Sequence, residues 1–476
     1  MFGRILKHEW RALTADATVW AIAAIFAAAI GYGVWNGGRW VTFQRGALQS
    51  AAAEESARYD RLKAQVAALS APGAKVSPFA DPRSPSNLGG RLGPRYAMLP
   101  PGPLAPLAIG QSDLLPYYFK VSTDARENIV TATEIENPNR LLAGRFDLAF
   151  VIIFLYPLLI LALTYNMLSS EQEQGTLSLA LSQPVSLRTM VSGKVALRAL
   201  VLLALLVAFS AAALAVTGAD LSAPGAATRL SLWLAIVAAY GAFWFALSIA
   251  VAALGKNSTT NATILASAWL VLIVMTPSLF NLMASVFYPV PSRVEMVQAT
   301  RVAQDEANKG GAQALARFYD DHPELATGDP AQAMNDFNVV RVAVNDEVER
   351  RVRPVVDRYE AQLAKQQGMM DSLRFLSPAI LMQGALNDIA GTGTERHRDY
   401  LAQVDAYHQR WRDYFVPKIF AKALMADFDA IPRFEYREEP TGAVAARVAM
   451  ALAGLLIPAV AIAVFGLRRL GRFAVI

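Results

Sequence analysis

The chain has 476 residues, of which 54% are apolar and only 17% are charged, and its mean hydropathy is +0.31. Ordinary soluble chains carry about 25% charged residues. The composition therefore excludes a wholly soluble multidomain protein, yet it is too polar for a chain that lies entirely inside a bilayer. The formal net charge is +5 and cysteine is absent, which excludes disulfides, thiolate catalysis and cysteine-ligated metals.

The first stretch, Met1 to Leu13, has the pattern of an amphipathic helix. Its apolar residues share one helical face and are Phe2, Ile5, Leu6, Trp10 and Leu13. Its basic residues share the other face and are Arg4, Lys7, His8 and Arg11. A helix of this kind lies in the membrane interface, so we expect an interfacial elbow helix over residues 1–15 in preference to a simple charged tail.

Six further stretches are long and apolar enough to span a bilayer, which takes about 20 mainly apolar residues. They cover residues 17–35, 147–168, 195–217, 229–254, 260–285 and 443–466. The first lacks the small-residue cleavage pattern of a signal peptide, so we interpret it as a retained helix. Pro277 lies inside the fifth stretch and should kink that helix, with neighbouring helices covering the freed carbonyl.

Basic residues cluster in four segments outside these stretches. They are Arg4, Lys7 and Arg11, then Arg188, Lys194 and Arg198, then Lys256, and finally Arg468, Arg469 and Arg472. In a six-span arrangement all four groups fall on one face, which the positive-inside rule assigns to the cytoplasm. We therefore expect an all-α polytopic protein of a bacterial inner membrane with both termini cytoplasmic. We interpret the basic residues as orienting the chain in the lipid bilayer and not as binding nucleic acid.

This topology divides the chain into six parts. They are the elbow helix 1–15, the first membrane helix 16–36, a first extracytoplasmic insertion 37–146, membrane helices two to five over 147–285 with a coupling loop at 169–194, a second extracytoplasmic helical domain 286–442, and the sixth membrane helix with a basic cytoplasmic tail 443–476.

The first insertion is expected to mix helix and loop. Gln44 to Leu69 is helix-like and compatible with a continuation of the first membrane helix out of the bilayer. From Pro72 to Pro103 proline and glycine are so frequent that neither helix nor central strand is expected. Leu114 to Phe119 is the most apolar patch, which we expect to pack on a core in preference to facing a ligand.

The second insertion is expected to be mainly helical. Between Ala331 and Gln367, apolar residues recur at spacings of three and four and are Phe337, Val340, Val344, Val348, Val352 and Val355. A second helix over Glu395 to Val416 has a largely aromatic stripe of Tyr400, Val404, Tyr407, Trp411, Tyr414 and Phe415. Pro354 should kink or break the first helix, and Pro417 should kink or end the second. Between them, Ser377-Pro378 predicts a helix start and Gly391 a helix stop.

Familiar catalytic and nucleotide-binding patterns are absent from the sequence. Gly193-Lys194 and Gly255-Lys256 lack the earlier glycine and the following Ser or Thr of a phosphate-binding loop. His397 and His408 would lie about 16 Å apart on one helix, too far for one metal, and we interpret them as surface histidines. The spans carry charges only near their ends, at Asp147, Arg198, Arg229 and Arg447. This argues against an ion-coupled carrier, so energy for any transport would enter from outside the bilayer.

A charged segment containing glycine joins the second and third stretches. It has the sequence Glu171-Gln172-Glu173-Gln174-Gly175-Thr176-Leu177, followed by Pro184, Ser186, Gly193 and Lys194. A short amphipathic element between two membrane helices is suited to binding a soluble partner. With the elbow helix and six spans around it, the segment resembles the coupling loop in permease subunits of ABC-2 type transporters, which often has the pattern Glu-x-Glu-x-Gly-Thr-Leu and then Gly-Lys.

The two large insertions make the chain similar to an uncharacterised subfamily of ABC permeases with a domain of unknown function. The segments that carry this likeness are Glu136-Asn137-Pro138, Gly144-Arg145-Phe146-Asp147, Ser377-Pro378-Ala379, Leu386 to Thr392, Tyr407 and Trp411. The resemblance implies that a separate cytoplasmic ABC ATPase hydrolyses Mg-ATP and that this chain is a non-catalytic permease with no cofactor of its own. It also implies that two permeases, identical or paralogous, pair in the complex, but it names no cargo.

The expected role of the coupling segment is to dock in a groove on the ATPase of an exporter. Glu171 and Glu173 would pair with basic residues of that partner, Gly175 would let the backbone turn, and Thr176 would cap the short helix that follows. Two alternatives stay open. One is an ATPase-driven complex that transmits force to a periplasmic protein or lipoprotein, and the other is a membrane-anchored extracytoplasmic sensor.

Overall fold

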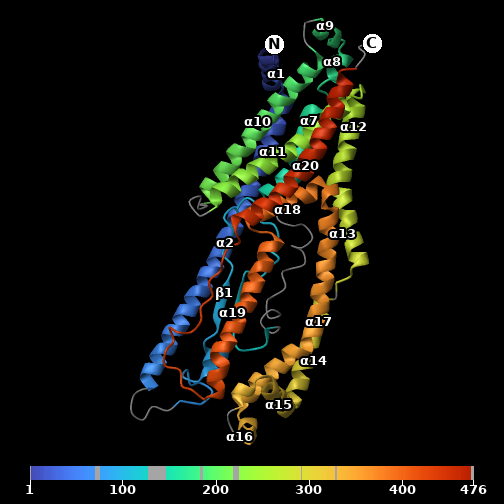
Figure 1. Cartoon of the computed structure of the whole chain (residues 1–476). Coiled ribbons are helices and arrows are strands. Elements are labelled where there is room, and N and C mark those ends of the chain that lie inside the picture. Colours follow the sequence, from blue (N-terminus) through green and yellow to red (C-terminus); the bar gives the residue numbers. More distant parts are fainter. Residues whose placement is uncertain are drawn as a thin grey trace.

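The computed structural model describes residues 2–69, 76–126, 146–182, 186–217, 225–290, 292–326 and 330–472. Within these ranges the protein is helical apart from one two-stranded sheet. The molecule is elongated, with a helical bundle forming one half and a mixed region of long helices, loops and the small sheet forming the other (Figure 1). The expectation of a helical membrane protein is confirmed at this level.

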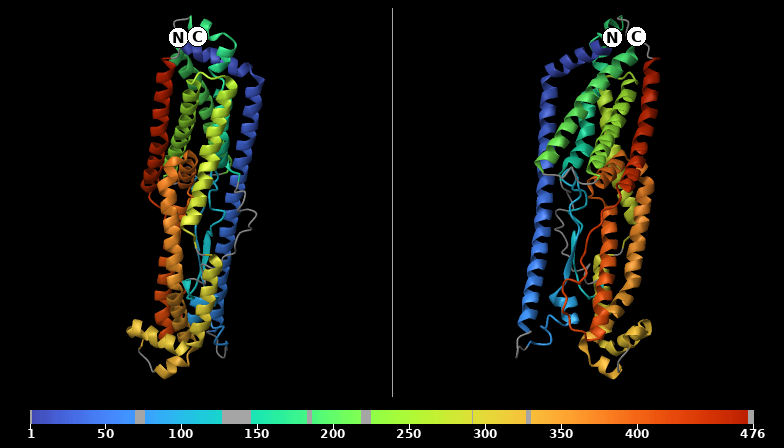
Figure 2. Two further views of the ribbon diagram at one scale, coloured as in Figure 1. Left: turned by 90° about the vertical axis from the view of Figure 1, so that its right-hand side faces the viewer. Right: turned by 60° about the vertical axis from the view of Figure 1, so that its left-hand side comes forward.

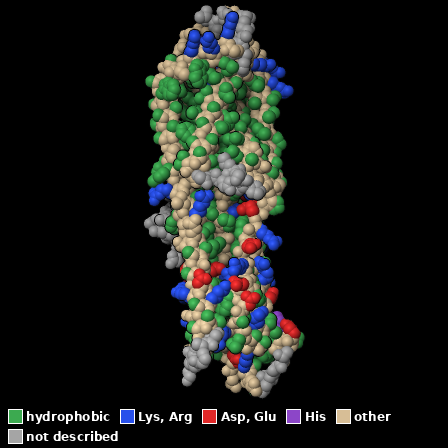
Figure 3. Space-filling model, turned by 90° about the vertical axis from the view of Figure 1, so that its left-hand side faces the viewer, with side chains coloured by type: hydrophobic (Ala, Val, Ile, Leu, Met, Phe, Trp, Pro, Cys, Tyr) green, Lys and Arg blue, Asp and Glu red, His purple; other side chains and the backbone are tan. Residues whose placement is uncertain are grey.

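Six helical segments of the bundle are long and apolar enough to cross a membrane. They are α2 (Ala17–Leu69), the run from α6 to α8 (Leu148–Glu173), α10 (Leu187–Val216), α11 (Ala226–Ala252), the run from α12 to α13 (Ser258–Phe287) and α20 (Thr441–Leu470). Apolar side chains cover one face of the bundle, whereas acidic and basic side chains alternate over the other half of the molecule (Figure 3). This division indicates a multi-pass membrane protein with a large polar region outside the bilayer.

Two of the spans contain a π-helical turn just before a proline. The turn η2 (Val151–Leu155) precedes Pro157, and η3 (Leu270–Met275) precedes Pro277. A proline in a helix removes one backbone donor and clashes with the carbonyl four residues earlier, and a π turn widens the helix at that point. The disturbance expected at Pro277 therefore takes the form of a local widening of the helix.

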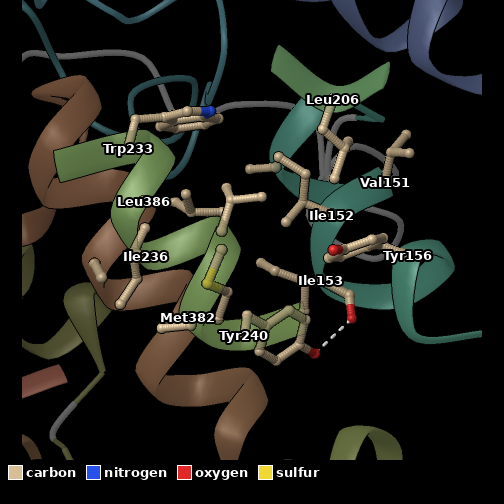
Figure 4. Close-up of a cluster of buried hydrophobic side chains, with 14 of the residues drawn as sticks. Val151, Ile152, Ile153, Tyr156, Leu206, Trp233, Ile236, Tyr240, Met382 and Leu386 are labelled. Atoms are coloured by element: carbon tan, nitrogen blue, oxygen red, sulfur yellow. Dashed lines mark hydrogen bonds between the residues drawn. The ribbon is translucent and has the colours of Figure 1, made fainter. Parts of the chain in front are cut away.

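Neighbouring elements bind the carbonyls around these π turns. Tyr240 donates its hydroxyl to the carbonyl of Ile153 at 2.8 Å (Figure 4), and this is the carbonyl four residues before Pro157. The Ser377 hydroxyl donates a hydrogen bond to the carbonyl of Leu272 at 3.1 Å, within the turn that precedes Pro277. Backbone oxygens inside a bilayer need such partners because water is absent there.

The core of the bundle is built around α11. Trp233, Tyr240 and Trp244 are fully buried on it, and α20 packs along its length. The short helix α18 (Pro378–Ala390) joins this core through Met382 and Leu386 (Figure 4). Its predicted ends are confirmed, because Ser377 accepts a bond from the backbone of Ile380 and Gly391 adopts a left-handed φ of 75°. With 13 residues, α18 is too short to span a bilayer, yet it packs among the spanning helices and not among the helices of the second insertion.

The helix α2 continues without interruption into the region outside the bundle, as its sequence allowed. There it lies beside the strands β1 (Arg95–Met98) and β2 (Tyr118–Val121), which pair antiparallel. The strand β1 lies inside the segment rich in proline and glycine, for which neither helix nor central strand was expected. The same segment contains the short helix α3 (Pro85–Asn87) and the π turn η1 (Leu88–Leu92), so it is less irregular than expected. The apolar patch after it divides, because Phe119 is buried whereas Leu114 and Tyr118 are exposed.

The second insertion forms most of the remaining helices. They are α14 (Arg293–Lys309), α15 (Gly311–Asp321), the 3-10 turn η4 (Pro323–Leu325), α16 (Pro330–Met334), α17 (Phe337–Leu373), the 3-10 turn η5 (Arg374–Leu376) and α19 (Thr394–Phe420). The stripe on α17 is largely confirmed, because Val344, Val348 and Val352 are buried, although Phe337 is exposed. The aromatic stripe on α19 lies in a core shared with β2 and the lower part of α2.

The two prolines of this region do not end their helices, so of the two outcomes expected at each proline, a kink or a break, the break is excluded. Helix α17 runs through Pro354 and α19 runs through Pro417. An interior proline costs a helix about 3 kcal/mol. Here apolar residues on both sides of each proline are buried in one core, Val352 and Val356 around the first, and Val416 and Ile419 around the second. Their burial offsets that cost.

Candidate functional site

The segment with the coupling-loop pattern lies at the end of the bundle that carries both chain termini. It forms two short helices, α8 (Ser169–Glu173) and α9 (Leu177–Leu181), beside the N-terminal helix α1 (Phe2–Ala15) and the last turn of α20 (Figures 1 and 2). On the face drawn in Figure 3, Lys and Arg side chains gather at this end and acidic side chains do not. We refer to α8, α9 and the turn between them as the loop cluster.

Glu171 is bound inside the chain. The Lys194 ammonium, in the second turn of α10, donates hydrogen bonds to Glu171 Oε1 at 2.6 Å and to the carbonyl of Met167 at 2.9 Å. The Lys194 side chain is only 11% exposed, so its charge needs both acceptors. Glu171 and Lys194 belong to one sequence motif, but the motif does not predict that they pair. The structure shows that their ion pair joins α8 to α10.

Glu173 also has partners within the chain. Its carboxylate accepts bonds from the backbone amide of Ser258 at 2.6 Å and from the Ser258 hydroxyl at 3.0 Å. Ser258 begins α12, whose cap is Asn257, and a negative charge is stabilised at the positive end of a helix. Because Glu171 and Glu173 both have intramolecular partners, neither carboxylate points freely toward a second protein.

The turn after α8 depends on glycine. Gly175 has φ of +70°, a conformation that side chains disfavour by about 1–2 kcal/mol. The Thr176 hydroxyl donates to the carbonyl of Glu171 at 3.3 Å and its amide donates to the same carbonyl at 2.9 Å. These bonds run from Thr176 back to α8, so the residue closes the preceding helix, while the expected cap on the following one stays a prediction.

Leu177 fixes the second short helix to the bundle. It is buried in a small apolar cluster with Met167, Met190, Ile249 and Leu470, which come from four different parts of the chain. Gln174 and Ser178 on either side of it are exposed. The loop cluster is therefore held by Leu177, by Leu181 packed against the same cluster, and by two carboxylates, and it presents Gln174 and Ser178 outward.

The remaining residues of the motif are placed as follows. Ser186 caps α10, since its hydroxyl accepts a bond from the Thr189 amide at 3.2 Å. Pro184 lies outside the described residues, as do residues 136–138, 144 and 145 of the segments that carry the subfamily likeness.

The N-terminal helix is amphipathic as expected, but the residue that attaches it to the bundle, Glu9, was not predicted from the sequence. Arg4, Lys7 and Arg11 are exposed, and Trp10 is 51% exposed. Glu9 is buried and accepts a bond from the Arg198 guanidinium at 2.7 Å. Arg198 also donates to the carbonyl of Leu163. A signal for the pair existed, because an arginine inside an apolar helix requires a partner and Glu9 is the sole acidic residue of α1.

Helices α1 and α8 therefore both contact the same face of α10. Lys194 and Arg198 are four residues apart, so their side chains lie one above the other. The first binds α8 through Glu171 and the second binds α1 through Glu9. A displacement of either the loop cluster or the N-terminal helix would act on α10 through a charged contact.

A second charged cluster lies at the opposite end of the bundle, where α18 meets the region outside it. Arg229 donates to the carbonyls of Asp388 and Ile389, each at 3.0 Å. Arg447 binds Asp388 at 2.9 Å and Glu439 at 2.7 Å. Arg229 and Arg447 had been noted only as charges near span ends, and the structure shows that their partners come from the second insertion.

Arg396 completes this cluster. It binds Glu438 through two bonds of 2.8 and 2.7 Å, and it also donates to the carbonyls of Pro100 and Gly391 at 3.1 Å. Glu438 lies 3.5 Å from Arg229 as well. Burial raises the pKa of Asp388, and the Arg447 cation opposes that rise. We refer to Arg229, Arg396 and Arg447 with Asp388, Glu438 and Glu439 as the clasp.

The expectation of two surface histidines is wrong. His408 is buried, and its Nε2 lies 2.9 Å from the carbonyl of Asp124, while His397 is half-buried. Burial lowers the pKa of each to about 4, with the neighbouring Arg412 and Arg396 cations contributing. The two face a core because α19 is covered on most sides. Within the described part of the chain, no group of three or more potential metal ligands is present.

Comparison with known proteins identifies one similar family. Residues 293–437 match the model of a domain of unknown function, DUF3526. The match begins at the start of α14 and ends one residue before Glu438, so it covers the second insertion without the spans on either side. No curated protein matches the chain.

Proposed function

We propose that this multi-pass membrane protein is the permease subunit of an ATP-driven ABC-2 type exporter in a bacterial inner membrane. In this proposal both termini are cytoplasmic and the two insertions are extracytoplasmic. A separate ATPase hydrolyses Mg-ATP, and a second permease, identical or paralogous, completes the complex.

One observation carries the proposal. The loop cluster, the amphipathic helix α1 and the basic C-terminal end of α20 lie together at one end of a bundle with six candidate spans (Figure 2). A partner on that side could contact the loop cluster and α1 at once. The contacts through Lys194 and Arg198 would then pass a push from either element to α10.

The intramolecular partners of Glu171 and Glu173 change the role proposed for these residues. Each carboxylate holds the loop cluster in place on α10 or α12, so it orients the docking surface. We assign direct contact with the ATPase to the exposed side chains between them, with Gln174 and Ser178 foremost. Domain movement through rigid helices is a common way to couple such an event to a distant site.

The test is purification of the full chain from its native membrane, followed by identification of co-purifying ATPase and measurement of its activity. Gln174→Trp and Ser178→Trp should each reduce ATPase activity stimulated by the permease about tenfold or more, because a bulky ring would block close docking. Thr228→Trp is the matched control, since Thr228 is exposed at the opposite end of the bundle. Full stimulation in both loop variants, or the absence of any ATPase from the purified complex, would refute the proposal.

A second candidate function is the transmission of force to a periplasmic protein or lipoprotein. The observation that favours it is α2, which runs for 53 residues without interruption from the bundle into the outer region. At 1.5 Å per residue this makes a rod of about 80 Å. A rod of this length joins the two halves of the molecule mechanically.

This second function can be separated from the first because the chain has no cysteine. Cysteines introduced at the exposed positions Ala52 on α2 and Ala361 on α17 would carry spin labels without background labelling. ATP should change their distance in the coupled complex, and a flexible glycine–serine insertion after Gly46 should abolish that change while ATPase stimulation persists. Cargo export with an unchanged distance would favour transport alone.

A further inference from the structure

An apolar groove separates α2 from α10 at the end of the bundle opposite the termini. Its volume is about 910 Å³, within the range of about 300–1,000 Å³ that is typical of sites for small ligands. Val34 and Phe43 from α2 and Phe209 and Val216 from α10 are among its lining residues. Val216 is 83% exposed, so the groove opens sideways from the bundle where α10 ends.

The lining of this groove includes one basic side chain, Arg39. Arg39 lies 4.9 Å from the centre of the Trp35 ring, a cation–π distance. Among the described residues, Arg39 forms no salt bridge, whereas the arginines of the clasp are all paired. The groove thus combines an apolar floor with a guanidinium that is available to an anion.

The surroundings of the groove are those of a membrane–water boundary. Tyr32, Trp35 and Phe43 are exposed on α2 around it, and aromatic side chains concentrate at the level of lipid head groups. Arg39 lies one helical turn beyond Trp35, on the side away from the termini. A ligand here would place its apolar part along the span and its polar part at Arg39.

We propose that this groove binds a single phospholipid, with an acyl chain between α2 and α10 and the phosphate at Arg39. Charge complementarity favours this occupant over a second copy of the chain, because Arg39 has a partner in the phosphate and an apolar helix would leave it unpaired. Guanidinium groups bind phosphate oxygens through paired bonds. The proposal does not depend on whether an ATPase drives the protein.

The test is native mass spectrometry of the full chain with added lipid. The probes are dioleoyl-phosphatidylglycerol and dioleoylglycerol, which share acyl chains but differ in the phosphate. Phosphatidylglycerol should bind the unchanged protein more strongly than dioleoylglycerol does. Arg39→Gln should weaken phosphatidylglycerol binding about fivefold, the ratio expected for one cation near a head group, and should remove the difference between the probes. Ala212→Phe should fill the groove and lower the occupancy of both.

Two matched controls isolate the groove. Arg45→Gln removes an exposed cation from α2, the helix that carries Arg39. Ala211→Phe adds a ring next to Ala212 in the chain. Arg45 and Ala211 do not line the groove. Both controls should bind lipid as the unchanged protein does. Equal lipid occupancy in all variants would show unspecific boundary lipid only and overturn the proposal. Loss of a dimer in Ala212→Phe, with lipid binding intact, would also overturn it in favour of a second copy.

Discussion

The two ends of the bundle are both held by charged side chains, but in different ways. At the end with the termini, Glu171 pairs with Lys194 and Glu9 pairs with Arg198, so each cation holds one acidic partner. At the clasp, Glu438 lies beside two arginines and Arg447 binds two carboxylates. The first end is a set of separate contacts, and the second is a network.

This difference has a mechanical consequence. Separate contacts can open one at a time, so a partner could displace the loop cluster or α1 without disturbing the other. A network with shared partners resists the loss of any arginine, because each arginine binds more than one acceptor and its loss would leave several of them without a donor. The end with the termini is therefore suited to movement, and the clasp is suited to passing that movement on to the outer region.

The largest effect is expected at the clasp. Arg396→Ala should destabilise the protein by about 4 kcal/mol, because it leaves the carbonyls of Pro100 and Gly391 without their donor, at about 1–3 kcal/mol each, and removes a buried side chain. Glu438 contributes little to this loss, since it is 37% exposed and still has Arg229 at 3.5 Å. Thermal unfolding in detergent, followed by tryptophan fluorescence, measures this. Arg398→Ala is the control two residues away, where an exposed pair with Glu395 should contribute about 0–1 kcal/mol. Equal melting of the two variants would show that the clasp is not a network.

A somewhat smaller effect is expected where α1 meets α10. Arg198→Met should cost about 3 kcal/mol because Glu9 stays buried without a cation, and it should release α1 to proteolysis. Adding Glu9→Gln should recover part of this loss. Arg11→Met changes an exposed residue of the same helix and should leave α1 protected. If Arg198→Met also leaves α1 protected, the pair is not what holds the helix.

Acid should weaken the outer region through the buried His408. His408 has a folded pKa of about 4, lowered by burial, against an unfolded value of about 6.5. The unfolded chain therefore binds the proton first, so stability is complete above pH 6.5 and falls as the pH drops toward 4, by about 3 kcal/mol.

The measurement is the unfolding midpoint of the outer region as a function of pH, followed through Trp411 beside this core. His408→Gln should remove part of the dependence between pH 6.5 and 4. His397, whose pKa burial also lowers to about 4, should account for the rest, so the double variant with His397→Gln should be flat. Charged neighbours of His408 are Arg412, Asp405 and Arg126, and all three stay in place in these variants, so an unchanged slope in His408→Gln would contradict the prediction.

The smallest effect is expected at the turn of the loop cluster. Gly175→Ala should cost about 1 kcal/mol through its left-handed backbone alone, because nothing lies within 4 Å of the added methyl group. Hydrogen exchange over residues 169–182 should speed up accordingly. Gly368→Ala meets equally open space inside α17, where alanine should instead stabilise the helix by about 0.5–1 kcal/mol. The same sign in both variants would argue against a strained turn.

Local patterns were enough to predict several elements. The spans, the amphipathic α1, the start of α18 at Ser377 and its end at Gly391 each depend on residues close together in the chain. At Pro354 and Pro417 local patterns left a kink and a helix end equally open, and burial on both sides keeps the helices unbroken. Local patterns also placed α18 in the second insertion, because a 13-residue apolar helix carries no local sign of the bundle that it joins.

What the sequence by itself determined was the apolar content of the six spans and the position of each charge along them, since hydropathy is summed over neighbouring residues. Only the tertiary structure decided which acid meets which base. Glu9 binds Arg198 across 189 positions of the chain, and Arg229 binds the carbonyls of α18 across 159 and 160 positions. A buried arginine requires some partner, and which partner it obtains depends on the packing of helices that are distant in the chain.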